Sequence, residues 1–191
     1  MTSATSPQGD PSAAAAIELA LSQVVPGRAC GTCTLCCKLI AVTEFNKPPG
    51  EWCLHVVRKG GCGIHPTRPT GCRTFFCHWM TEKTLGPEWK PEKSKLVAVP
   101  GDGGHMTVFV DPGTPGAWRQ APYFETIQRW SREGARASPA RIVTIRIATR
   151  VIVILDREID LGHVGPDDSV RFEPGPDGRI TARKVPREHA R

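Results

Sequence analysis

All eight cysteines of this 191-residue chain lie between Cys30 and Cys77, and residues 78–191 contain none. Secreted domains that depend on disulfides usually distribute their cysteines more widely. Residues 1–10 also lack the basic segment with which a secretory signal begins. We therefore expect a cytoplasmic protein, because clustered thiols in a reducing compartment act as metal ligands or redox groups.

The spacing of the cysteines is typical of a metal site. The first four follow the pattern C-x2-C-x2-C-C, and the other four follow at short intervals. Thiolates are soft anionic ligands for zinc and iron, and a gap of two residues lets neighbouring thiolates converge on one ion or cluster. The candidate ligands of this transition-metal site are Cys30, Cys33, Cys36, Cys37, Cys53, Cys62, Cys72 and Cys77.

The spacing leaves the identity of the metal open. Eight thiolates suffice for two zinc sites of four cysteines each. Three cysteines at two-residue gaps with a remote fourth also match the ligands of a 4Fe-4S cluster, although no proline follows Cys77. Consecutive side chains diverge in extended segments, so Cys36 and Cys37 are expected to serve two centres, or one of them to pack or react. We favour one 4Fe-4S cluster over two zinc sites.

The block from Cys62 to Cys77 carries further signature residues, the pairs Arg68-Pro69 and Cys72-Arg73. Together with the first cysteine run, this block resembles the YkgJ-like CxxCxxCC family, which is described as a zinc- or iron-chelating domain. His65 stands where the family usually has a tyrosine. The resemblance covers the cysteine segment and implies metal binding, whereas residues 95–191 resemble no family.

The same cysteine domain is found in flagellin lysine N-methylases, where it resembles an iron-sulfur binder. We do not expect this chain to catalyse methyl transfer, because the C-x3-C-x2-C spacing of radical S-adenosylmethionine enzymes is missing. A Gly-rich nucleotide loop between a strand and a helix is missing too, since residues 101–104 lie between two expected strands. Whether the protein is an enzyme is left open, and a redox role, an accessory role, a zinc-stabilised binding module and metal handling are the alternatives.

Other side chains beside the cysteines are secondary candidates. A histidine can replace a thiolate or donate a hydrogen bond to one, an arginine can offset thiolate charge, and an aromatic ring can exclude water. The histidines and arginines of this kind are His55, His65, His78, Arg68 and Arg73. The aromatic residues are Trp52, Phe75, Phe76 and Trp79.

Hydrophobic periodicity and turn residues predict an α+β fold. We expect a disordered lead at 1–12, a cysteine-rich metal-binding module at 13–92, a β-rich portion at 93–184 and a basic tail at 185–191. The module should consist of short hairpins and helices, and the β-rich portion should be mostly antiparallel with one amphipathic helix. The expected helices are 13–24, 70–83 and 122–134. The expected strands are 39–45, 54–57, 62–65, 95–99, 106–110, 141–150, 151–155, 170–173 and 179–184.

Charge and hydropathy exclude several classes of function. The net charge is +6, but six arginines at 129–150 are followed by seven acidic residues at 156–177. Such alternation is typical of solvated surfaces, and the absence of a recognisable module with interleaved aromatic residues argues against nucleic-acid binding. No apolar run reaches 18 residues, so we expect no membrane span. A protein partner or an electron-transfer partner is compatible with the sequence.

Overall fold

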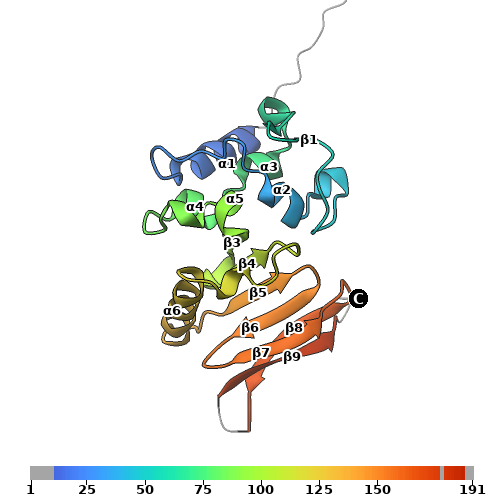
Figure 1. Ribbon diagram of the computed structural model, residues 1–191. Helices are drawn as coiled ribbons and strands as arrows, with labels where there is room; N and C mark the ends of the chain where they lie inside the picture. The colour runs from blue at the N-terminus through green and yellow to red at the C-terminus, as the bar shows by residue number, and fades with distance from the viewer. Residues whose placement is uncertain (1–10, 177–178, 188–191) are drawn as a thin grey trace, which may run out of the picture.

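The computed structural model describes residues 11–176 and 179–187, and it places short helices and loops above a β-sheet (Figure 1). The α-helices are α1 (Pro11–Ser22), α2 (Leu35–Leu39), α3 (Thr70–Thr74), α4 (His78–Thr81), α5 (Pro91–Ser94) and α6 (Tyr123–Ala135). The 3-10 helices are η1 (Thr43–Phe45), η2 (His65–Thr67), η3 (Pro87–Trp89), η4 (Asp102–Gly104) and η5 (Ala117–Arg119). The strands are β1 (Val56–Val57), β2 (Gly61–Cys62), β3 (Leu96–Pro100), β4 (Met106–Val110), β5 (Val143–Ile147), β6 (Arg150–Ile154), β7 (Glu158–His163), β8 (Asp168–Pro174) and β9 (Ile180–Pro186).

The central sheet has the order β3-β4-β5-β6-β7. Its strands pair antiparallel except for β4 and β5, which run parallel. A parallel pair needs a long crossover, and here α6 lies in the segment that connects the two strands. The hairpins β1-β2 and β8-β9 form separate two-stranded sheets. The expected α+β class with mostly antiparallel strands is therefore confirmed.

Helix α6 forms where apolar residues recur at helical spacing, and it buries Tyr123 and Ile127. The chain also needs a glycine near the end of this helix. A Cβ atom on Gly134 would lie 2.3 Å from the carbonyl oxygen of Arg141, just before β5. The Arg141 N–H donates a hydrogen bond of 3.0 Å to the Gly134 carbonyl, so this close approach joins α6 to the sheet.

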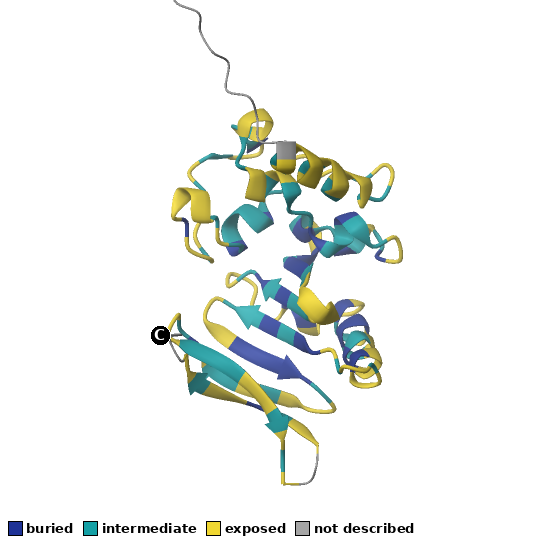
Figure 2. Cartoon of the chain, turned by 180° about the vertical axis from the view of Figure 1, so that it is seen from behind, coloured by how far each residue is buried: buried dark blue, intermediate teal, exposed yellow. Residues whose placement is uncertain are grey.

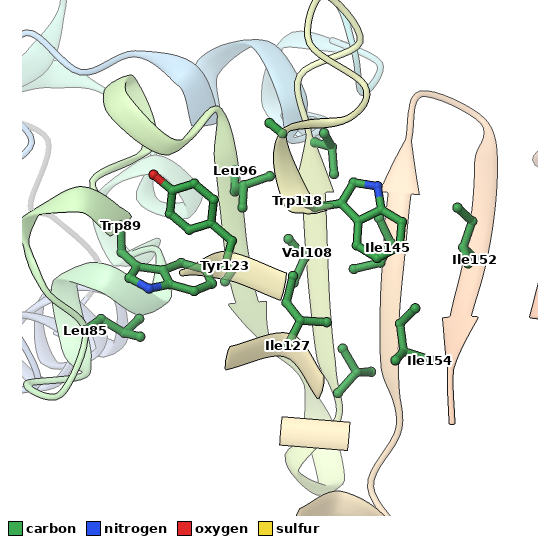
Figure 3. Close-up of a cluster of buried hydrophobic side chains, with 14 residues drawn as sticks. Leu85, Trp89, Leu96, Val108, Trp118, Tyr123, Ile127, Ile145, Ile152 and Ile154 are labelled. Carbon is green, nitrogen blue, oxygen red and sulfur yellow. The ribbon is translucent and has the colours of Figure 1, made fainter. Parts of the chain in front are cut away.

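The largest apolar core lies between α6 and one face of the sheet (Figure 3). Trp118 from η5 and Ile127 from α6 pack there against residues such as Ile145 from β5. The core also includes Leu85 and Trp89, from the segment expected to belong to the cysteine-rich module. The two halves of the chain therefore share one core, and Figure 2 shows buried residues concentrated in the sheet and α6.

The opposite face of the sheet is covered by two different elements. Because side chains alternate along a strand, Leu96 faces the α6 core while Val97 faces the other way. Val97 packs against Leu35 and Leu39 of α2. Further along the sheet, the β8-β9 hairpin covers Val151 and Val153 of β6. This arrangement fixes the first cysteine run against the edge of the sheet.

An ion pair links the cysteine segment to the sheet. Lys38 Nζ of α2 lies 2.7 Å from Asp111 Oδ1, which directly follows β4. Burial raises the pKa of Asp111, but hydrogen bonds from Lys38 and the Gly113 N–H outweigh it, so the pKa is lowered. A lowered pKa in the folded state means that this stabilisation is lost as the pH falls through it.

We expect Asp111→Asn to lower the free energy of unfolding by about 1 kcal/mol at neutral pH. Asparagine keeps the oxygen that accepts the Gly113 N–H and removes only the charge. Urea unfolding should show this loss, and the difference from the wild type should shrink in acid. Asp102→Asn is the control, because Asp102 is exposed and has no ion pair to another described residue. Equal effects of the two substitutions would contradict the prediction.

Several expected elements differ from the structure. The strand expected at 39–45 is wrong: α2 ends at Leu39 and η1 follows, because Leu35 and Leu39 pack at helical spacing on the sheet. The helix expected at 70–83 is divided into α3 and α4 by extended backbone at Phe75 and Cys77. Strand β7 was not anticipated. Strand β9 reaches Pro186, so the expected tail begins later.

Residues 1–10 and 188–191 lie outside the described part of the chain, and with them most of the expected lead and tail. Helices 13–24 and 122–134 and the hairpins at 54–65, 95–110 and 170–184 are confirmed, with shifted ends. Among the described helices, none combines the length and the hydrophobicity that crossing a membrane would require.

Candidate metal centre

Six of the eight cysteines line one cavity of about 290 Å³. They come from four separate segments of the chain, and they are Cys30, Cys36, Cys37, Cys53, Cys62 and Cys72. Cys33 and Cys77 are not part of its lining. The wall also contains Arg68, His55 and Glu44. The fold therefore gathers cysteines that are far apart in sequence around a single space.

Helix α2 brings Cys36 and Cys37 to the cavity together. The segment is helical rather than extended, and both residues line the cavity. The interaction between the two thiols raises the pKa of Cys36 and lowers that of Cys37 to about 7.

The loop after α2 places Cys53 beside Cys37. The Cys53 N–H donates a hydrogen bond of 3.1 Å to the Cys37 carbonyl, and the Gly50 N–H donates one of 2.9 Å to the Lys38 carbonyl. The side chain of Lys47 adds three more hydrogen bonds to carbonyls of this region. Sequence reasoning missed Lys47, because a lysine in a polar loop is ordinarily exposed.

The β1-β2 hairpin carries Cys62 toward the first cysteine run. Cys62 pairs with Val56, as the expected hairpin requires. At Gly61 the backbone has φ +85°, and a Cβ atom would lie 3.1 Å from the Gly31 carbonyl oxygen. A glycine is needed here for both reasons, and it lets the hairpin approach the turn between Cys30 and Cys33 closely.

Cys72 and Cys77 occupy different surroundings. Cys72 lies in α3, whose Gly71 N–H donates a hydrogen bond of 3.1 Å to Glu44 on the cavity wall. Cys77 precedes α4 and is buried in the apolar cluster with Leu35 and Met80. Burial raises the pKa of Cys77 to about 11. Cys77 therefore lies in the apolar layer between the cavity and the sheet.

The electrostatic interactions among the thiols form two overlapping neighbourhoods that meet at Cys37. In the first, Cys77 interacts with Cys30 and Cys33, whereas Cys36 interacts most with Cys37 and then with Cys30 and Cys33. In the second, Cys72 interacts with Cys37 and Cys53, and Cys62 completes the same cavity wall. The first group comprises Cys30, Cys33, Cys36 and Cys77. The second group comprises Cys37, Cys53, Cys62 and Cys72.

Arg68 lies on the cavity wall with an unused hydrogen-bond donor. Its Nε is buried and has no hydrogen-bond partner among the described residues. Its positive charge lowers the pKa of the Cys37 thiol and opposes the rise that burial causes at Cys30 and Cys72. The expected charge compensation by Arg68 thus has a geometric basis, whereas Arg73 is exposed and is not part of the lining.

Only some of the secondary candidates line the cavity. His55 lines it, with its ring 4.8 Å from that of Phe45. His65 and His78 are not part of its wall, and the His78 ring packs 5.5 Å from Trp130 of α6. The aromatic residues divide in the same way. Phe75 lines the cavity, Phe76 and Trp79 pack on the apolar cluster around Cys77, and Trp52 is 52% exposed and is not part of the lining.

Within residues 11–176 and 179–187, no three His, Cys, Asp or Glu side chains converge as a ready site for one metal ion. The cavity cysteines instead surround a wider space. Comparison of the chain with protein-family models, curated proteins and solved structures finds no match, so the cavity itself is the basis for inferring function.

Proposed function

We propose that this protein binds a transition-metal centre through thiolates of the cysteine cavity, and that the centre is an iron-sulfur cluster with a redox or accessory role. The observation that carries the proposal is the gathering of six cysteines from four segments around one cavity. If the cysteines served only as small buried hydrophobic residues, they would not need to converge on one cavity. Soft anionic thiolates suit iron-sulfur clusters and zinc.

Two features of the cavity, its volume and a free hydrogen-bond donor, fit an iron-sulfur cluster. Its volume of about 290 Å³ far exceeds the roughly 10–15 Å³ that a single water molecule requires by the same kind of measure. The buried Arg68 Nε has no protein partner and can donate a hydrogen bond to a sulfur atom in the cavity. Hydrogen bonds to sulfur are a known way in which proteins tune iron-sulfur centres.

The residues that would hold the centre are the second group of cysteines, because all four line the cavity. When bound, an iron-sulfur cluster supplies one-electron chemistry. The protein's own residues keep the thiolates in place through the hydrogen bonds around Cys37 and Cys53. Arg68 offsets their charge, and Phe75 excludes water from one side of the cavity.

A second candidate function is a zinc-stabilised binding module. The observation that favours it is that the eight thiols form two overlapping neighbourhoods, since eight thiolates suffice for two structural zinc ions with four ligands each. In that case the adjacent Cys36 and Cys37 would belong to different centres. A metal-handling role would use the same residues.

Anaerobic purification without chelator tests the proposal. Elemental analysis should find at least about one equivalent of metal, because closed thiolate sites bind by roughly 10–16 kcal/mol. We expect iron with acid-labile sulfide and a broad visible absorbance. A colourless protein with two zinc ions per chain would replace the cluster by the zinc module. A fully folded protein without metal would contradict both.

A further inference from the structure

Lys47 is the only charged side chain that is buried among the described residues, with 8% of its surface exposed. Its ammonium group donates hydrogen bonds to three carbonyls, those of Ile40 at 2.6 Å, Pro48 at 2.8 Å and Lys38 at 3.3 Å. An ammonium group has three N–H donors and a neutral amine only two. The three acceptors therefore match the charged form.

No carboxylate forms an ion pair with Lys47 in the part of the chain that the structure describes. The groups whose negative charge acts on it include the thiols of Cys53, Cys37 and Cys36, together with the more exposed Glu51. The ammonium group of Lys47 donates to the carbonyl of Lys38, the residue directly after Cys37, and the Cys37 carbonyl in turn accepts the Cys53 N–H. A buried cation thus lies beside the cysteines without a carboxylate to neutralise it.

We propose that Lys47 is a positioning residue of the metal centre and also its fixed counter-charge. This inference rests on the proposed function. The hydrogen bonds of Lys47 hold residues 38–48 in the conformation that brings Cys53 to Cys37. Its buried charge stabilises negative charge at the centre and so favours the form that carries one additional electron.

The electrostatic part of the inference follows from burial. A charge in the low-dielectric interior acts more strongly on its neighbours than an exposed charge, which water and salt screen. In reduction, an external one-electron donor transfers one electron to the centre, and no bond forms or breaks. The negative charge then rises by one, and a nearby ammonium group lowers the free energy of that state.

Four variants separate the two roles. Lys47→Gln keeps N–H donors for the carbonyls but removes the charge, whereas Lys47→Arg keeps both. Lys47→Met removes both. Lys59→Gln is the matched control, because Lys59 is exposed although it lies three positions before Cys62. Each anaerobically purified holoprotein is titrated with dithionite while the visible absorbance is recorded.

We expect Lys47→Gln and Lys47→Met to disfavour reduction about tenfold, which is about 59 mV toward negative potential for a one-electron couple. Lys47→Arg and Lys59→Gln should stay near the wild type. A Lys47→Gln centre with the wild-type potential would overturn the counter-charge role. An equal shift in Lys59→Gln would also overturn it, because burial would then not matter.

Chelator competition provides a second readout that applies to iron and zinc alike. The metal retained by each variant is measured against increasing chelator concentration. We expect Lys47→Gln to lose metal at about tenfold lower chelator concentration than the wild type, and Lys47→Arg to restore retention. If Lys47→Gln and Lys47→Met retain metal as well as the wild type does, the inference about Lys47 is refuted. The proposed function is still supported in that case, because the wild type binds metal. A wild type without metal would refute the proposed function itself.

Discussion

If the cysteines bind a metal as proposed, removing it from the holoprotein is expected to abolish hydrogen-exchange protection in residues 30–81 while strands β3–β6 keep theirs. The physical reason is the distribution of apolar burial. Before Leu85, the only buried hydrophobic residues in the described chain are Leu35, Leu39, Cys77 and Met80. So small a core does not support a fold by itself, and the roughly 10–16 kcal/mol of metal binding becomes folding energy.

The measurement is hydrogen exchange followed by mass spectrometry before and after anaerobic chelation. The sheet serves as the internal control, because its core with α6 contains fully buried residues such as Ile127 and Ile145. Adding the metal back should restore protection in residues 30–81. Unchanged protection in this segment after complete metal removal would show that the site is peripheral to folding.

The second large effect is expected from single cysteine-to-serine substitutions. Serine is a poor ligand for a soft metal, so changes in the second group should abolish the visible absorbance. These variants are Cys37→Ser, Cys53→Ser, Cys62→Ser and Cys72→Ser. The matched controls are Cys33→Ser and Cys77→Ser, which lie in the same segment but do not line the cavity. They should retain the metal.

Metal analysis of the same variants counts the centres. With one centre, Cys33→Ser and Cys77→Ser keep the full metal content. If these two variants instead lose about half of the metal, the first group holds a second centre, which would contradict the single cluster. Loss of all metal from every variant would contradict the division into two groups.

Much of the fold follows from local patterns in the sequence. The amphipathic spacing of Phe124, Ile127 and Trp130 predicts α6, and the turn between 100 and 106 predicts the hairpin of β3 and β4. These elements depend on residues close together in the chain, so periodicity and turn chemistry are sufficient. The strand expected at 39–45 was wrong because packing of Leu35 and Leu39 on Val97 favours a helix.

The candidate site, like the fold, was predicted only in part from the sequence. By itself the sequence determined that eight thiols are concentrated in one segment and that their spacing suits a metal, because short gaps bring neighbouring ligands together. Only the tertiary structure decided that Cys33 and Cys77 lie outside the cavity and that Lys47 is buried, with its ammonium group on the carbonyl of the cavity residue Ile40. Both facts depend on loops folding back on α2 and on the packing of α2 against the sheet. No local pattern encodes such long-range contacts, so the arrangement of the site could not be derived from spacing.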